Sequence, residues 1–285
     1  MGTHWGEPAS YDRLDEVRRD AAAVAALWQG AQVLPVGSRG VLPTRESATA
    51  VEFVTTPAGG PYDPQRHWLL GRDGDRVSFT MIDDEIDGVT IREVGAHLAP
   101  VDLELSTMAV AMAEWHRLEP HCPRCGGPSL VTAAGSARTC PTCRRDLFPR
   151  TDPAVIVAVV DESDRLLLGH QASWPAGRFS VLAGFVEAGE SLEQAVHREV
   201  LEEVGVRLHD VTYVASQPWP FPRSIMLGFT ARATGTEIRV DGTEIVEARW
   251  FTRQELRVGV ASGEVGLPTP ASIASRLVAG WLNRG

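Results

Sequence analysis

Residues 184–206 constrain the structure of this chain more than any other window, because they combine a helix start, a helix stop and an acidic face. Ser191 and Gln194 form a capping-box pattern, in which each side chain satisfies a backbone donor at the start of a helix. Gly205 predicts the helix end, since glycine adopts the left-handed conformation of a C-cap at little cost. Apolar residues recur between these signals at helical spacing: Leu192, Ala195, Val196, Val200 and Val204. The window therefore predicts an amphipathic helix.

Three glutamates, Glu199, Glu202 and Glu203, gather on this predicted helix. Glu199 and Glu203 share a face because residues four apart on a helix are neighbours, and like charges at this spacing repel by about 0.2–0.5 kcal/mol per pair. A hard divalent cation such as Mg²⁺ prefers carboxylate oxygens and often bridges a protein to phosphate groups. The spacing alone is consistent with a metal site or with a solvated acidic helix.

The complete motif places glycines, an arginine, a further glutamate and aliphatic residues around these glutamates. It consists of Gly184, Glu190, Arg198-Glu199, Glu202-Glu203 and Gly205, with aliphatic residues at 200 and 206. This arrangement resembles the Nudix box at every specified position. The resemblance implies an α/β/α sandwich and a Mg²⁺- or Mn²⁺-dependent hydrolase of a nucleoside diphosphate linked to another moiety.

A second motif, residues 216–224, reads Ser-Gln-Pro-Trp-Pro-Phe-Pro-Arg-Ser. Alternating prolines fix φ and remove amide donors, so we expect a stiff extended loop and not a strand. Such a run could simply cover the edge of a core. Beside the box, however, it resembles the element that distinguishes the NADH pyrophosphatase (NudC-like) subfamily, in which it wraps the substrate. The expected substrate contacts are Gln217, Pro218, Trp219, Pro220, Phe221, Pro222, Arg223 and Ser224.

The resemblance also assigns metal ligands. It makes Glu199 and Glu203 the principal ligands, with Glu202 beside them and the backbone carbonyl of Ala183 completing the set. Glu244 aligns with a distal metal-binding glutamate of the subfamily, although Glu247 is a plausible competitor. Nudix enzymes differ in the carboxylate that activates water, so this role stays open. Structural roles within the box are expected for Gly184, Glu190, Arg198 and Gly205.

Further substrate contacts follow from the same resemblance. Phe185 occupies the position expected to stack on a base, and Ala274 aligns with a position that gives a backbone contact. Phe148 stands where the family commonly has tyrosine, a change that retains stacking and loses a phenolic hydrogen bond. Core packing is the alternative for each phenylalanine. Gly135 replaces a carboxylate found in some relatives, so no role is transferred to it.

All four cysteines lie in two C-x2-C pairs separated by fourteen residues: Cys122, Cys125, Cys140 and Cys143. Four thiolates in two knuckles suit tetrahedral Zn²⁺. Two disulfides are the competing interpretation, but a chain of 285 residues can build a core without such staples. Because four cysteines already fill a zinc site, we expect His116 and His121 to lie at the surface or to support the ligands.

Charge distinguishes this cysteine region from the rest of the chain. Its arginines are Arg124, Arg138, Arg144, Arg145 and Arg150, whereas the whole chain has a net charge of −10. Such a basic face could contact nucleic-acid phosphates, or it could be the solvated face of a folding staple. The chain contains no lysine, which excludes Schiff-base chemistry and a Walker-type phosphate lysine.

We divide the chain into an N-terminal α+β domain at 1–115, a zinc ribbon at 116–150 and a Nudix domain at 151–285. Expected strands cover 51–54, 68–70, 77–82, 154–160, 166–169, 180–183, 211–216, 225–231 and 248–251. Expected helices cover 11–29, 105–115, 191–205, 252–257 and 271–282. No apolar run reaches the length of a membrane span, so we expect a soluble cytoplasmic protein without membrane partners. The subfamily resemblance suggests a homodimer.

The activity implied by the resemblance is hydrolysis of NAD(H) to AMP and nicotinamide mononucleotide, extending to removal of NAD caps from RNA 5′ ends. ADP-ribose or another dinucleotide is the alternative substrate within the same class of enzyme. The alternative to an enzyme is a nucleic-acid-binding or regulatory protein, in which a zinc ribbon accompanies an inert Nudix fold.

Overall fold

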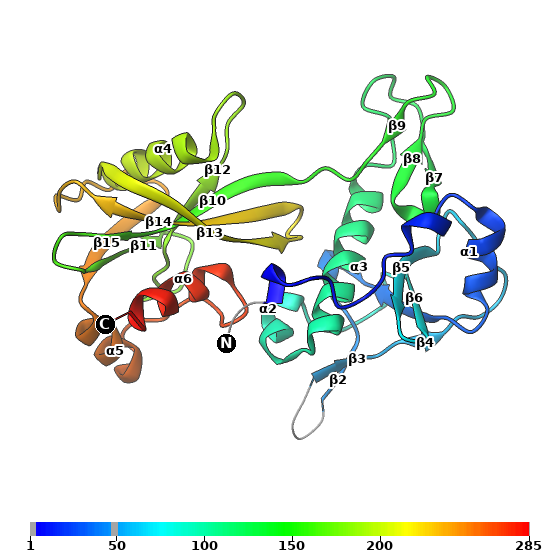
Figure 1. Cartoon of the computed structure of the whole chain (residues 1–285), viewed down its shortest axis with the longest axis horizontal. Coiled ribbons are helices and arrows are strands. Elements are labelled where there is room, and N and C mark those ends of the chain that lie inside the picture. Colours follow the sequence, from blue (N-terminus) through cyan, green and yellow to red (C-terminus); the bar gives the residue numbers. More distant parts are fainter. Residues whose placement is uncertain (1–3, 47–50, 285) are drawn as a thin grey trace. The chain divides into compact units, whose positions relative to one another are not determined.

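The computed structural model describes residues 4–46 and 51–284 and divides the chain into two compact units (Figure 1). The C-terminal unit contains residues 152–218 and 224–284 together with 4–6. The N-terminal unit contains residues 7–46, 51–151 and 219–223. The expected boundary at 150/151 lies one residue from this division. The expected boundary at 115/116 instead falls inside one helix, and residues 219–223 group with the N-terminal unit.

The C-terminal unit is built on a six-stranded mixed sheet in the order β13-β14-β10-β11-β15, with β12 paired to β10. Its strands are β10 (Asp152–Val160), β11 (Leu166–Gln171), β12 (Leu182–Phe185), β13 (Leu208–Trp219), β14 (Ser224–Ala233) and β15 (Ile245–Phe251). β10 runs parallel to β14 and antiparallel to β11 and β12. Residues 154–159 of β10 are all buried, as its unbroken apolar run predicts for a strand covered on both faces.

Helices cover both faces of this sheet, giving the predicted α/β/α sandwich (Figure 1). Because side chains alternate along a strand, Val155 and Val157 of β10 pack with α4 (Leu192–Val204). Ile156 of β10 lies in the opposite core with α5 (Arg253–Ser262) and α6 (Ile273–Leu282). The two cores therefore share one sheet, with α4 alone on its own face.

Helix α4 begins and ends where its local signals predict. The Gln194 amide N–H donates to Ser191 Oγ at 3.2 Å, and the Ser191 N–H donates to Gln194 Oε1 at 2.8 Å. Gly205 adopts a left-handed φ of 73° at the C-cap. The capping box and the glycine stop are confirmed.

The N-terminal unit combines a four-stranded sheet with helices. The sheet has the order β4-β1-β6-β5, from β1 (Gln32–Val36), β4 (Thr56–Pro57), β5 (Trp68–Asp73) and β6 (Arg76–Ile82). β2 (Thr44–Glu46) and β3 (Val51–Phe53) form a separate pair. The helices are α1 (Ala21–Trp28), α2 (Ile91–Val94) and α3 (Pro100–Leu118). Residues 32–36 were not predicted as a strand.

The cysteine region forms a three-stranded sheet of β7 (Leu130–Thr132), β8 (Ala137–Thr139) and β9 (Asp146–Leu147). Gln65 binds the backbone of Val131 through both of its amide atoms, at 2.9 and 3.1 Å. Gly135 has a φ of +97°, and a Cβ there would lie 2.4 Å from Trp68 Cβ. The ribbon therefore packs closely on the rest of the N-terminal unit, and only glycine fits at position 135.

Three sequence-based expectations need correction. The helix expected at 11–29 starts at Ala21, because the Asp20 carboxylate caps it by accepting from two backbone N–H groups at 3.0 Å. The helix expected at 105–115 starts at Pro100, since proline fits the first turn of a helix. The loop expected at 216–224 is partly strand, because β13 continues to Trp219. β13 lies at a sheet edge, where the missing N–H of Pro218 is tolerated.

None of the helices in the described part of the chain is long and apolar enough to cross a membrane.

Candidate active site

Strand β12 approaches helix α4 very closely at Gly184. A Cβ built on Gly184 would lie 1.9 Å from the carboxyl carbon of Glu199 and 2.1 Å from one of its oxygens. No side chain fits in that space. The glycine that opens the motif therefore allows the Glu199 carboxylate to lie directly against the backbone of β12.

We predict that Gly184→Ala lowers turnover by about a hundredfold, because the added methyl group must displace the Glu199 carboxylate. Steady-state kinetics with a diphosphate substrate and saturating Mg²⁺ would measure the effect. Gly189→Ala is a matched control, since a Cβ there meets no atom within 4 Å, although its φ of +95° adds backbone strain. Equal activity of Gly184→Ala and wild type would contradict the proposed role of this contact.

Arg198 organises the acidic residues around it. Its guanidinium forms a two-point ion pair with Glu190, at 2.6 and 2.9 Å, and donates to the Phe185 carbonyl at 2.9 Å. It also lies 2.9 Å from a Glu199 oxygen and 3.0 Å from a Glu202 oxygen. Arg198 holds the pKa of Glu190 down at about 2, with help from the Glu187 backbone N–H. The expected structural pair thus fixes the loop to the helix.

Glu203 is a buried acid with an unsatisfied carboxylate oxygen. Its side chain is 4% exposed, and Oε2 is buried without a hydrogen-bond partner. Burial first of all, together with the negative charges of Glu244 and Glu199, raises the pKa of Glu203 to about 8. The pKa of Glu199 is also raised, by burial first of all. The charges that act on Glu203 are all negative, whereas Glu199 has the Arg198 guanidinium at 2.9 Å.

Metal-free protein should lose stability as pH rises because of Glu203. The carboxyl titrates near 4.5 when unfolded and near 8 when folded, so folding favours its neutral form across that window. We expect the free energy of unfolding of Glu203→Gln to exceed that of wild type by about 2 kcal/mol at pH 8.5, with a higher Tm, and the two to be equally stable at pH 4. Scanning calorimetry of the zinc-loaded protein without added Mg²⁺ or Mn²⁺ measures this. A higher wild-type Tm at pH 8.5 would contradict the burial of an uncompensated charge.

Glu244 reaches this group through a turn that sequence reasoning missed. The Asp241 carboxylate accepts from the backbone N–H groups of Thr243, Glu244 and Ile245, at 2.8–3.2 Å. The Asp241 N–H donates to the Glu203 carbonyl at 3.0 Å. Aspartate favours such turns because its short side chain bonds the backbone just ahead of it, so Asp241 was recognisable in principle. The turn links Glu244 to the end of α4.

Glu247, the competing acid, lies on β15 with its side chain 51% exposed and 3.9 Å from Arg249. Glu244 is among the negative charges that raise the pKa of Glu203. The geometry therefore favours Glu244. Glu202, with its side chain 60% exposed, is held at the rim by Arg198.

These acids have the chemistry that a hard divalent cation requires: carboxylate oxygens, an orphaned buried oxygen and unbalanced negative charge. Ala183, whose carbonyl is the remaining expected ligand, lies in β12 opposite Ile156. In the described residues, only the cysteines bring three or more ligand atoms close enough for a single ion. The glutamates fit the metal by chemistry, but they do not converge on one point.

The two aromatic candidates are exposed. Phe185 ends β12 with 59% of its surface exposed, and Phe148 follows β9 with 63% exposed. The core-packing alternative is therefore wrong for both. Each ring is available to stack on a planar group, although they belong to different units.

Gln217 differs from the expectation of a free substrate contact. It is buried, its Nε2 donates to the Ala271 carbonyl at 2.8 Å, and its Oε1 accepts from the Ile273 N–H at 2.6 Å. Its side chain is thus committed to the first turn of α6, where Ala274 lies buried. Gln217 orients the backbone around Ala274.

The aromatic part of the proline motif belongs to the N-terminal unit. The Trp219 and Phe221 rings meet edge to face at 5.2 Å, and the Arg92 guanidinium lies 5.1 and 4.5 Å from their centroids. Arg223 forms an ion pair with Glu119 at 2.8 Å. The other members of the motif are Pro218, at the end of β13, Pro220, Pro222, and Ser224, the first residue of β14. Contacts as well as prolines therefore hold this segment.

The four cysteines converge. Sγ of Cys122 lies 3.6 Å from that of Cys143, Sγ of Cys125 lies 3.5 Å from that of Cys140, and all four lie within 4.8 Å of one another. Thiolates bound tetrahedrally to zinc at about 2.3 Å would be about 3.8 Å apart, whereas a disulfide needs about 2.05 Å. All four thiols are free, so the disulfide alternative is not what the structure contains.

Two expectations about the ribbon's polar residues are wrong. His116 is buried, its Nε2 lies 2.9 Å from the Gly135 carbonyl, and burial lowers its pKa to about 4. Arg138 is also buried and binds His116 Nδ1 at 2.9 Å and the Ser129 carbonyl at 2.7 Å. Arg138 is therefore part of the interior. The exposed basic residues are Arg124, Arg144, Arg145 and Arg150.

A sheet between two helical layers, with an acidic helix set against a glycine, defines a Nudix hydrolase. Residues 150–266 match the family model of the NUDIX domain. Over 95% of its length the chain is 38% identical to the NAD-capped RNA hydrolase NudC of Mycobacterium bovis (strain BCG / Pasteur 1173P2), of which it covers 92%. The chain belongs to the Nudix hydrolase family.

Two further relatives share less of the chain. It is 40% identical to human NAD-capped RNA hydrolase NUDT12, over 61% of this chain and 40% of that protein. A crystal structure of a NUDIX hydrolase from Nitrosomonas europaea is 26% identical with a TM-score of 0.40, covering 47% of this chain and 78% of that one.

Proposed function

We propose that this enzyme hydrolyses the pyrophosphate of NAD(H) to AMP and nicotinamide mononucleotide, and that it removes NAD caps from RNA 5′ ends. The observation that carries the proposal is the buried, unpartnered carboxylate of Glu203 beside Glu199 and Glu244. The relatives named NAD-capped RNA hydrolase, matched along nearly the whole chain, support this choice of substrate.

Glu199, Glu203 and Glu244 would hold Mg²⁺ or Mn²⁺, with the Ala183 carbonyl as a backbone ligand and Glu202 at the rim. When bound, such an ion neutralises phosphate charge and lowers the pKa of a water molecule. Arg198 limits the movement of Glu199 through its 2.9 Å contact and fixes the loop at Phe185. Gly184 gives Glu199 the room to lie against β12. This preorganisation keeps the acids in place before the substrate arrives.

Substrate recognition is proposed to use exposed aromatic faces and backbone groups. Phe185 offers a face for a planar base. Ala274 supplies a backbone contact from a turn that Gln217 holds by two hydrogen bonds. Trp219 and Phe221 form a paired aromatic surface within their motif. Phe148 gives a further stacking face without the hydroxyl that tyrosine would add.

We propose that the cysteine cluster holds one structural Zn²⁺. Its sulfur–sulfur distances of 3.5 and 3.6 Å support a tetrahedral thiolate site with no open position. Four thiols held this close without disulfides suit a reducing compartment, and on this basis we propose a cytoplasmic location.

A homodimer remains a proposal from the family resemblance. β13 lies at one edge of its sheet, and Tyr213 and Val214 on that strand are 53% and 38% exposed. Such an edge offers unpaired backbone groups and apolar surface to a second copy. Light scattering at several concentrations tests the assembly.

The function is tested by comparing NADH, NAD⁺, ADP-ribose and NAD-capped RNA on one preparation, with and without Mg²⁺ or Mn²⁺. We expect metal-dependent release of AMP and reduced nicotinamide mononucleotide from NADH, and of nicotinamide mononucleotide and 5′-phosphate RNA from NAD-capped RNA. Faster cleavage of ADP-ribose than of all NAD substrates would replace the proposed substrate. No metal-dependent cleavage of the whole panel would favour an inert Nudix fold.

Charge on the ribbon predicts a difference between free and capped substrates. Arg144 and Arg145 are exposed, and contacts of this kind to RNA phosphates release counterions, so they favour binding most strongly at low salt. We expect the double change to Gln to weaken capped-RNA turnover about tenfold at low salt and to leave NADH turnover within about twofold. The matched control is the double change Arg19→Gln and Arg66→Gln, because both arginines are exposed in the same unit. Equal loss on both substrates would count against RNA contact.

A further inference from the structure

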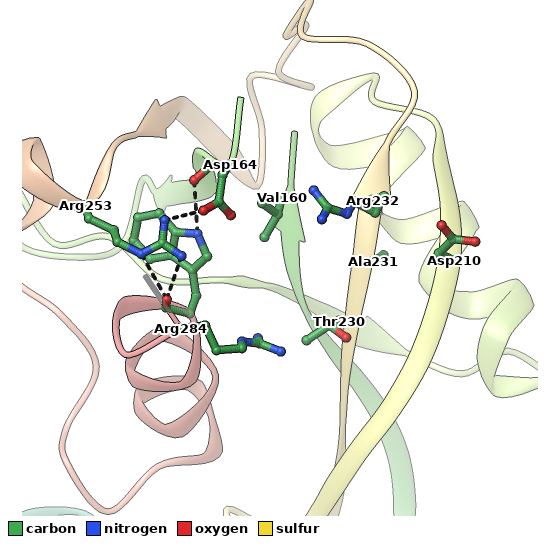
Figure 2. Close-up of a pocket in the computed structure, with 9 residues that line it drawn as sticks. Val160, Asp164, Asp210, Thr230, Ala231, Arg232, Arg253 and Arg284 are labelled. Atoms are coloured by element: carbon green, nitrogen blue, oxygen red, sulfur yellow. Dashed lines mark hydrogen bonds and ion pairs between the residues drawn. The ribbon is translucent and has the colours of Figure 1, made fainter. Parts of the chain in front are cut away.

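A cavity lies in the C-terminal unit, between the end of β10, β14 and the C-terminal end of α6 (Figure 2). Its volume is about 440 Å³, within the size range of small-molecule sites. Three arginines line it, Arg232, Arg253 and Arg284, together with the polar residues Thr230, Asp164 and Asp210. Nothing in the proposed reaction uses these residues.

Strand register separates this cavity from the candidate active site. Val160 of β10 pairs with Arg232, four residues beyond Ile156, which pairs with Ala183. Four residues of strand span about 13 Å. Thr230 and Arg232 alternate with Phe229 and therefore lie on the other sheet face, since Phe229 packs in the core with α4. The cavity thus opens on the face opposite the acidic helix.

Arg253 forms part of the cavity wall and is already neutralised. Its Nη1 pairs with the Asp164 carboxylate, and Nε and Nη2 donate to the Trp281 carbonyl at 3.2 and 3.0 Å. Its guanidinium also stacks 4.6 Å from the Trp281 ring centroid, and the Trp281 indole N–H donates to the Asp164 carbonyl at 3.2 Å. This network fixes one side of the cavity.

Arg232 and Arg284 supply the uncompensated charge. Arg232 donates through Nη1 to the Asp161 carbonyl at 3.2 Å, and Arg284 donates through Nε to the Gly280 carbonyl at 2.9 Å. Neither forms a salt bridge within the part of the chain that the structure describes. Asp210, the remaining acid of the lining, forms a hydrogen bond with His209 Nδ1 at 3.0 Å, and its single charge leaves the lining with a net positive charge. Each guanidinium therefore keeps most of its five donors for a ligand.

We propose that this cavity binds the phosphate group of a small phosphorylated ligand such as a nucleotide. Two guanidiniums that carry a permanent charge match the geometry of phosphate oxygens, and Thr230 is a further hydroxyl-bearing residue of the same lining (Figure 2). The fixed Arg253–Asp164–Trp281 wall gives the ligand a rigid boundary. The proposal goes beyond the diphosphatase activity and does not depend on it.

Equilibrium binding to the full zinc-loaded chain, without added Mg²⁺ or Mn²⁺, tests the proposal with three probes: inorganic phosphate, AMP, and a single-stranded RNA without terminal phosphates. We expect Arg232→Gln and Arg284→Gln each to weaken phosphate and AMP binding about tenfold. Arg239→Gln is the matched control, because Arg239 is an exposed arginine of the same unit with its side chain 74% exposed. NADH turnover and Tm should stay unchanged in all three variants.

The probes separate the sources of the phosphate. Tighter binding of AMP than of RNA, sensitive to both arginines, supports a small ligand. If the two substitutions weakened binding of the RNA only, the cavity would bind a nucleic-acid backbone, and the small-ligand assignment would be overturned. Unchanged affinity of both variants for every probe would overturn the proposal altogether.

Discussion

Glu203→Gln should lower turnover of NADH about 10³-fold or more while leaving the fold intact. The amide has the shape of the carboxyl but carries no charge, so it cannot compensate a divalent ion. Because Oε2 of Glu203 is buried and unpartnered, no nearby group can replace it. Steady-state kinetics over a range of Mg²⁺ and Mn²⁺ concentrations would measure the loss.

The comparison needs a control on the same helix. Glu193→Gln removes one negative charge from the exposed first turn of α4, and we expect its turnover to stay within about twofold of wild type. Circular dichroism and thermal unfolding without added Mg²⁺ or Mn²⁺ should show both variants folded. Near-wild-type turnover of Glu203→Gln would refute its assignment as a metal ligand.

The second large effect should follow loss of the thiolate cluster. Cys140 is fully buried, and we expect Cys140→Ser to lose the bound zinc and to unfold the ribbon locally. Zinc bound by four cysteines contributes about 10–16 kcal/mol of apparent binding energy, which becomes folding energy in a segment this small. Elemental analysis should give one zinc per wild-type chain and none in the variant. Limited proteolysis should then cut between residues 120 and 147.

Thr142→Ser, in the same knuckle but outside the cluster, is the control for this substitution. It should retain one zinc per chain and resist proteolysis like wild type. A Cys140→Ser protein that kept full zinc occupancy would contradict the four-thiolate site. A variant that lost zinc but stayed equally resistant would show that Arg138 and His116 suffice to hold the ribbon.

Local signals explain the parts of the molecule that were predictable. The start and end of α4 depend on Ser191, Gln194 and Gly205, which lie within the helix or next to it. Both ends could therefore be predicted from the local sequence alone. The buried run of β10 and the two cysteine knuckles are likewise local patterns. Membership of the Nudix family, read from the box, is confirmed by the family comparison.

Partners distant in sequence explain what was missed. Gln217 looked like a free polar side chain because its acceptor and donor, Ala271 and Ile273, lie 54 and 56 residues away. His116 and Arg138 looked like surface groups because each satisfies the other only after α3 and β8 have packed. Burial of a polar residue depends on such remote contacts, and no periodicity in the sequence encodes them.

The Arg92 guanidinium over Trp219 and Phe221 matters for anyone who trims this protein to its hydrolase half. A fragment beginning at residue 152 would keep Glu199, Glu203 and Glu244. It would lose Arg92, so the rings of Trp219 and Phe221 between β13 and β14 would be exposed. Such a fragment would tend to aggregate, and its conformation would change in residues 216–224, the segment proposed to bind the dinucleotide. Kinetic data from the shortened version would therefore understate what the intact chain can do.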